Sequence, residues 1–166
     1  MSPLHRLGTA VAAVLSAAVV LVALAPAASA AAATAPSSTS STSSTSVPCG
    51  SVRQIGEKKV VSDLGMSAFT VRQYIGWCRD SRGSAWMNFA SVYVWDQYHA
   101  RGLAYRSYAG VAVRGEPETR GFTTSANRQQ LSYSVPVRTT TSCTQGWGKL
   151  SRSGSESAQG LSSLVC

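Results

Sequence analysis

Four cysteines set the tightest limit on what this chain can fold into. Cys49, Cys78, Cys143 and Cys166 all lie in the region 49–166. An even number of cysteines in one small domain predicts two disulfides if the chain is exported. Sequence alone allows three pairings of four cysteines. We favour Cys49 with Cys78 and Cys143 with Cys166, because each bridge would then hold one end of the domain.

Residues 1–30 have the pattern of a signal peptide. Arg6 supplies the positive start, residues 8–25 form an almost uncharged apolar run, and the small residues at 28–30 match a cleavage site. The alternative is a retained anchor, because the run is near the shortest length that spans a bilayer. Pro26 and the cleavage pattern argue against an anchor. We therefore expect cleavage and a secreted, extracellular protein with no stable membrane insertion.

Residues 31–48 are expected to form a disordered Ser/Thr-rich linker. The segment has no charge and few bulky apolar side chains, so ordering it would cost chain entropy and bury little. Its hydroxyls offer attachment points for sugars in an exported chain. The abrupt change of composition at Cys49 predicts that one secreted domain covers residues 49–166.

The leader and the abundance of Ala, Ser and Arg resemble those of exported proteins from high-GC Gram-positive bacteria. This resemblance implies a bacterial source and covers only composition and leader. Residues 49–166 resemble no characterised family, so no functional residue is transferred from one.

The clearest strand pattern lies at residues 86–97, where both faces of an extended strand would be apolar. This is typical of a central strand in a sandwich or barrel. After a short break that contains Gly102, residues 103–115 form a second alternating run. Because the break is short and polar, we predict that the two runs form an antiparallel hairpin.

Residues 131–138 alternate as a third strand. Pro136 lacks an N–H group, so this strand is expected at a sheet edge. The Thr-rich segment 139–150 is expected to pair with it as the last strand. The pattern predicts four side chains facing the core and three facing outward, namely Leu131, Tyr133, Val135 and Val137 inward and Ser132, Ser134 and Arg138 outward.

Residues 69–77 fit either a strand or a helix by spacing, and their β-branched and aromatic content favours a strand. The chain thus shows short strands, Gly-rich breaks and no sustained helical pattern. We predict an all-β fold, a small disulfide-bonded antiparallel β-sandwich or barrel, preceded by the signal peptide and linker.

Catalytic and metal sites lack the residues they usually need. His99 is the sole imidazole after the leader and lies beside Asp96 in the predicted turn. No serine after the leader stands in a G-x-S-x-G setting, which a nucleophilic serine often requires. A zinc site or catalytic thiol is disfavoured because no C-x-x-C pair exists. We predict no catalytic residue, no metal and no cofactor.

Two other activities fit the composition. A small secreted hydrolase such as a ribonuclease could use His99, a Glu and several Arg, but no local pattern brings the glutamates Glu57, Glu116 and Glu118 to His99. A protease inhibitor would need an exposed, disulfide-braced loop, and segment 79–83 directly after Cys78 is a candidate.

The basic residues favour a binding role. Lys and Arg number 15 against seven acidic residues, which gives a net charge of +8, and Arg outnumbers Lys. Arginine makes planar, paired contacts with phosphate, sulfate or carboxylate. Arg72 and Tyr74 would share one face of a strand, and Arg106 and Tyr108 one face of another. In one sheet they would form a cationic surface with flat rings. The plain alternative is that these arginines only keep the sheet in solution.

Trp147 is a further candidate contact, because it stands between glycines near Cys143. A ring on such a loop is often exposed, whereas the alternative is a ring folded over the disulfide. The sequence therefore predicts a non-enzymatic binding or interaction module at the cell surface or in the medium. Its expected partner is an anionic cell-wall polymer, a polysaccharide or another secreted protein, while nucleic acid is indicated by net charge alone.

Overall fold

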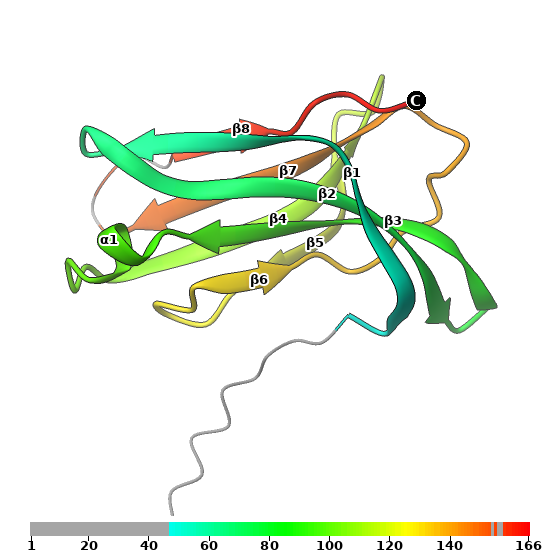
Figure 1. The fold of residues 1–166 in the computed structure, drawn as a ribbon, viewed down its shortest axis with the longest axis horizontal. Coiled ribbons are helices and arrows are strands. Elements are labelled where there is room, and N and C mark those ends of the chain that lie inside the picture. The colour runs from blue at the N-terminus through cyan, green and yellow to red at the C-terminus, as the bar shows by residue number, and fades with distance from the viewer. Residues whose placement is uncertain (1–46, 154, 156–157) are drawn as a thin grey trace, which may run out of the picture. The chain divides into compact units, whose positions relative to one another are not determined.

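The computed structural model describes residues 47–153, 155 and 158–166. Within these ranges the chain forms two antiparallel β-sheets and a single helical turn, α1 (Asp96–His99) (Figure 1). The predicted all-β fold is confirmed. The predicted signal peptide and residues 31–46 of the predicted linker lie outside the described residues. No helix in the described ranges is long and apolar enough to cross a membrane.

The first sheet, sheet A, has the strand order β1-β2-β3-β6. Its strands are β1 (Cys49–Asp63), β2 (Met66–Asp80), β3 (Gly83–Val94) and β6 (Leu131–Tyr133). Leu64 and Gly65 join β1 to β2 with φ angles of 54° and 74°. Positive φ at both central residues is the pattern of the hairpin turn whose twist matches the flanking strands. Residues 69–77 lie within β2, so the preference for a strand is confirmed.

The second sheet, sheet B, has the order β5-β4-β7-β8. Its strands are β4 (Tyr105–Val113), β5 (Thr119–Thr124), β7 (Thr144–Arg152) and β8 (Ala158–Leu161). The edges of the two sheets are joined, because Ser163 N–H donates to Glu57 O (3.0 Å) and Val135 N–H donates to Gly121 O (2.9 Å). The fold is a sandwich whose open edges are closed as in a flattened barrel.

The main core lies between the sheets, where β7 comes very close to sheet A. A Cβ atom built on Gly148 would lie 2.6 Å from a methyl carbon of Val71 and 2.7 Å from one of Val92. Glycine is therefore required at this point of β7. The main core consists of buried apolar and aromatic side chains, chiefly Phe69, Val71, Val92, Val94, Tyr98, Tyr105, Ala109 and Leu150.

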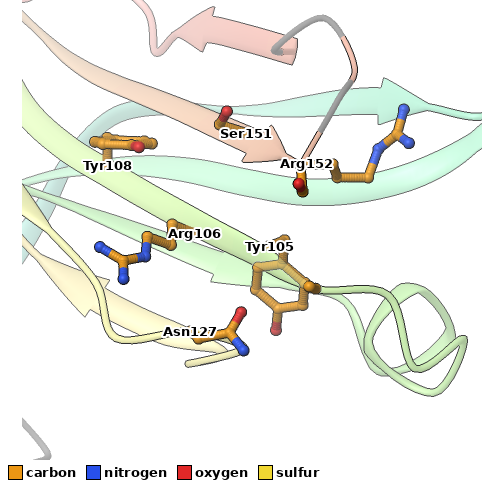
Figure 2. Close-up of a pocket in the computed structure, with 8 residues that line it drawn as sticks. Tyr105, Arg106, Tyr108, Asn127, Ser151 and Arg152 are labelled. Atoms are coloured by element: carbon orange, nitrogen blue, oxygen red, sulfur yellow. The ribbon is translucent and has the colours of Figure 1, made fainter.

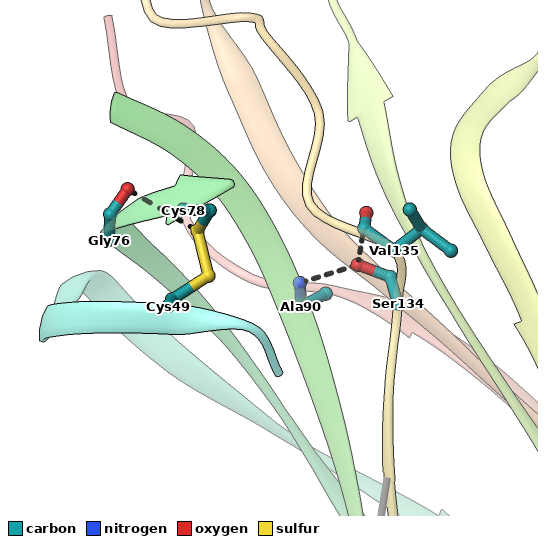
Figure 3. Close-up of a disulfide and its surroundings, with 6 residues drawn as sticks. All are labelled: Cys49, Gly76, Cys78, Ala90, Ser134 and Val135. Atoms are coloured by element: carbon teal, nitrogen blue, oxygen red, sulfur yellow. Dashed lines mark hydrogen bonds between the residues drawn. A yellow bond between two sulfur atoms is a disulfide. The ribbon is translucent and has the colours of Figure 1, made fainter. Parts of the chain in front are cut away.

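Both disulfides have the predicted pairing. Cys49 is bonded to Cys78 and ties the start of β1 to β2 (Figure 3). Cys143 is bonded to Cys166 and ties the segment before β7 to the last residue of the chain. The favoured sequential connectivity is confirmed.

The predicted hairpin of residues 86–97 with 103–115 is wrong. β3 lies between β2 and β6 in sheet A, whereas β4 lies between β5 and β7 in sheet B. The connecting segment forms α1 and carries Tyr98, which is fully buried in the core between the sheets. Because this anchor holds the connection across the end of the sandwich, the chain passes from one sheet to the other instead of turning back.

Strand β6 is an edge strand, as Pro136 predicted. Arg138 is exposed as predicted, but the predicted facing is wrong for four residues, Leu131, Ser132, Ser134 and Val135. Leu131 and Val135 are 40% and 54% exposed, while Ser132 and Ser134 are buried. Ser134 Oγ accepts a hydrogen bond from Ala90 N–H (2.9 Å; Figure 3). Small hydroxyl side chains fit here because the two sheets close toward each other at this edge.

Segment 139–150 does not pair with residues 131–138. Residues from Thr144 onward form β7, which pairs with β4 and β8 in sheet B. The predicted pairing is wrong because residues 134–143 carry the chain from sheet A across to sheet B.

Candidate functional site

Three aromatic rings gather on the outer face of sheet B. Phe122 from β5 lies between Tyr108 from β4 and Trp147 from β7, with ring centroids 5.7 Å and 6.0 Å apart. Phe122 is 53% exposed, and the other two rings are half-buried. We call these three residues the aromatic patch.

Glycine in the middle of β4 allows the aromatic patch to form. Gly110 is the register partner of Trp147, and a Cβ atom at Gly110 would collide with Thr119 of β5. Without that atom β5 can lie close over β4, and Phe122 can reach both neighbouring rings. The lack of a side chain at one position thus draws three strands' aromatic residues together.

Alternation along β4 places Arg106 on the same face as Tyr108. The neighbouring residues Tyr105, Ser107 and Ala109 point into the core and are buried. Lys149 of β7 is the register partner of Tyr108, and its Nζ lies 5.9 Å from the centre of the tyrosine ring. Two basic side chains therefore lie close to one ring of the aromatic patch.

A polar hollow of about 180 Å³ adjoins the aromatic patch at Tyr108 (Figure 2). Arg106 is exposed there, and no described residue forms an ion pair or a hydrogen bond with its guanidinium group. Arg152 is turned away from the hollow in Figure 2. The hollow is lined by Ala104, Tyr105, Arg106, Tyr108, Asn127, Ser151, Arg152 and Ser153.

Arg152 is occupied elsewhere, in a paired contact with Asp63 of β1 (2.8 and 3.2 Å). Burial raises the pKa of Asp63, but hydrogen bonds from Arg152 and from the Tyr98 hydroxyl outweigh burial and lower that pKa below its usual value. Burial and the Asp63 carboxylate raise the pKa of Tyr98. These three residues connect β1, α1 and β7, so their role is structural and Arg106 is the available cation of the hollow.

Arg72 and Tyr74 lie in sheet A, so the structure does not bring them together with Arg106 and Tyr108. Tyr74 stacks on Phe89 with centroids 5.3 Å apart, and Phe89 is only 1% exposed. Arg72 lines an open depression with Gln54, Gly56, Glu57 and Lys58. The single cationic surface that both pairs would have formed is absent, because β2 and β4 belong to different sheets.

Trp147 lies in strand β7, not in a loop, and its ring contacts Phe122. Phe122 itself was missed, because it stands alone between Gly121 and Thr123 with no pattern around it. Only the pairing of β5 with β4 brings it to Tyr108.

Trp77 and Trp86 form an exposed cross-strand pair toward the turn that joins β2 to β3. Their rings meet edge to face with centroids 5.7 Å apart. Such pairs stabilise a hairpin by themselves, so this pair has a sufficient structural explanation.

His99 is held by structural contacts. Its Nδ1 lies 2.7 Å from the Tyr105 hydroxyl, and its carbonyl accepts a hydrogen bond from Arg128 (3.1 Å). Among the described residues no interaction joins His99 to a glutamate, and Glu116 forms an ion pair with Arg120 (2.6 Å). No group of three His, Cys, Asp or Glu residues in the described ranges could hold a metal ion.

Segment 79–83 forms a tight turn between β2 and β3, in which Asp80 is the register partner of Gly83. Arg138 clamps this turn, because its guanidinium group donates two hydrogen bonds to Asp80 (2.8 and 2.9 Å). The same contact lowers the pKa of Asp80 to about 2. A tight turn of this kind does not present the extended segment that a protease would bind.

No known protein family matches this chain, and neither a curated protein nor a solved structure shows a significant match.

Proposed function

We propose that the protein is a secreted, non-enzymatic binding module whose aromatic patch holds a polysaccharide of the cell surface or the medium. The observation that carries this proposal is the contiguity of three rings, of which the middle one, Phe122, is 53% exposed. Leaving apolar area in water costs roughly 25 cal/mol per Å². Single exposed apolar side chains are ordinary, but a contiguous exposed group is a mark of a binding surface.

A sugar chain fits the chemistry of this face. The C–H face of a sugar ring packs on an aromatic ring, and its hydroxyls need polar neighbours such as those in the hollow. Nucleic acid would require a continuous track of cations along its backbone. Around the aromatic patch, the basic side chains that lie close to Tyr108 are Arg106 and Lys149. This ratio of rings to charges favours a polysaccharide.

The disulfides and the leader pattern support a role outside the cell. Two disulfides are typical of exported proteins, and the leader pattern at residues 1–30 agrees with export.

Val47 packs beside Cys49 on a cluster of sheet A formed by Cys78, Met87 and Phe89. The described part of the chain therefore enters the sandwich on sheet A, and no segment of the described residues covers the aromatic patch on the outer face of sheet B.

Retention on insoluble polysaccharides and washed cell walls tests the proposal, at salt concentrations of about 0.05 and 0.5 M so that screening separates charge from fit. Trp147→Ala should weaken retention about tenfold, the usual scale of one lost ring contact. Trp86→Ala is the matched control, because it removes a tryptophan outside the aromatic patch and should leave retention unchanged.

Equal loss in both variants, or release of the wild type from every matrix at high salt, contradicts the proposal. Turnover of RNA, a peptidoglycan fragment or a protease substrate that His99→Ala abolishes would show an enzyme instead. Stoichiometric inhibition of a secreted protease would show an inhibitor.

A further inference from the structure

We propose that the bound polysaccharide carries carboxylates, and that the hollow beside the aromatic patch holds a uronic-acid carboxylate against Arg106. This inference rests on the proposed function, because it presumes that a sugar ring lies on the aromatic patch. It adds the chemical class of the ligand and a residue that selects it.

The size of the hollow limits what it can accept. A volume of about 180 Å³ equals the space of roughly six water molecules. Pockets that enclose a whole small ligand are larger, about 300–1,000 Å³. The hollow therefore suits one charged substituent with part of its hydration, while the rest of the ligand lies on the open face of sheet B.

The spacing along β4 suits a sugar acid. Arg106 and Tyr108 are two residues apart on one face, which separates their Cα atoms by about 6.5–7 Å along the strand. A uronic acid carries its carboxylate on the ring, so a ring packed on the aromatic patch can direct its own or its neighbour's carboxylate toward Arg106. Lys149 lies across from Tyr108 and offers a second cation to the next acidic group.

The lining of the hollow supplies the donors that a carboxylate needs. The planar guanidinium group of Arg106 can make two parallel hydrogen bonds to one carboxylate. Asn127 and Ser151 add an amide and a hydroxyl donor to the lining (Figure 2), and Ser153 adds a second hydroxyl. None of the described residues that line the hollow is acidic. An unpaired cation among neutral donors is the arrangement that binds an anion most favourably.

Binding to two matched polymers tests this inference. Polygalacturonate carries a carboxylate on every ring, and its carboxyl-reduced form has the same linkage without the charge. The full exported chain should bind polygalacturonate more tightly than the reduced polymer. Arg106→Gln should weaken binding to polygalacturonate about tenfold, the scale of one lost charge-assisted contact, and leave binding to the reduced polymer unchanged.

Arg79→Gln is the matched control, because it removes the same charge from an exposed position on β2. Equal losses for Arg79→Gln and Arg106→Gln would show attraction to net charge alone and overturn the inference. Equal binding of both polymers by the wild type would overturn it as well, while the proposed function would stand. If the wild type binds neither polymer, and Tyr108→Ala does not change retention on the insoluble polysaccharides and cell walls, the proposed function itself fails. Tighter binding of single-stranded DNA than of polygalacturonate would assign the site to nucleic acid.

Discussion

The two outer faces of the sandwich begin from the same pattern and end differently. Each carries an Arg and a Tyr two residues apart, on β2 in one sheet and on β4 in the other. On sheet A, Tyr74 stacks on Phe89, which is 1% exposed beside the Cys49–Cys78 disulfide. On sheet B, Tyr108 stacks on Phe122, which is 53% exposed.

The difference shows that neighbouring strands decide whether such a pattern becomes core or surface. On sheet A, the start of β1 and its disulfide pack against the aromatic side chains and form a small second core. On sheet B no comparable segment in the described ranges packs on the aromatic patch. The tyrosine of the pair therefore packs against a buried ring on sheet A and belongs to an exposed aromatic group on sheet B.

The largest expected effect comes from replacing the central ring of each face. Phe89→Ala should lower the free energy of unfolding by about 3–5 kcal/mol, because it leaves a cavity under Tyr74. Phe122→Ala should lower it by less than about 1 kcal/mol, since water already reaches this ring. Denaturant unfolding of both variants checks this. Similar losses would mean that the two rings are equally part of the core, and would contradict the difference between the two faces.

Removing the disulfide of sheet A should uncover that face. Cys49→Ala with Cys78→Ala should cost about 3–4 kcal/mol for the loss of a loop constraint and raise the nitration rate of Tyr74. The matched control is Cys143→Ala with Cys166→Ala, which removes a bridge of similar sequence separation, 23 against 29 residues. The control should lose nearly as much free energy of unfolding and leave the nitration rate of Tyr74 unchanged. Nitration is followed by mass spectrometry. An unchanged nitration rate of Tyr74 in both variants would contradict the covering role of β1.

A smaller effect is expected at β6, whose two sides differ as the two faces do. Ser132→Leu should cost about 1–3 kcal/mol, because it forces a large side chain between the sheets. Leu131→Ser should change stability by no more than about 0.5 kcal/mol, because Leu131 is largely exposed. Thermal unfolding of the two variants checks this. The opposite ranking would restore the facing that the alternation of residues 131–138 predicts.

The last and smallest expected effect is a change of stability with pH. The pKa of Asp63 is lowered in the folded protein, so its contacts with Arg152 and Tyr98 contribute stability above the unfolded pKa near 4 and lose it as the pH falls through the folded pKa. Asp63→Asn should be less stable than the wild type by a constant margin above about pH 5, and the margin should shrink below about pH 4. Melting temperatures between about pH 3 and pH 7 measure the margin. A margin independent of pH would show that the carboxylate charge does not tie β1 to β7.

Local pattern could predict the strands of this fold but not their partners. The patterns at residues 86–97 and 103–115 indicated β3 and β4, although Asp96 and Gln97 belong to α1. A short polar break with a glycine, however, looks the same whether the chain turns back or crosses to another sheet. Buried Tyr98 decides between them, and its burial depends on core residues distant in the chain. The facing predicted within residues 131–138 was wrong for a related reason. Ser132 and Ser134 are hydrogen-bonded to Ser107 and Ala90, which are distant in sequence.

The candidate site divides in the same way. Alternation alone places Arg106 beside Tyr108, because side chains two apart on a strand share a face. Phe122 could not be found, since nothing around it in the sequence points to Tyr108. Its place depends on the pairing of β5 with β4 and on the missing side chain at Gly110.

The sequence by itself determined the all-β class and the face of β4 that Arg106 and Tyr108 share, because these depend on residue types and on spacing within a segment. It favoured the observed pairing of the four cysteines without excluding the other two pairings. Tertiary structure alone decided which strands share a sheet, which tyrosine packs against a buried ring, and which rings meet on sheet B. Those outcomes depend on contacts between segments far apart in the chain, and the short-range spacing of side chains carries no information about them.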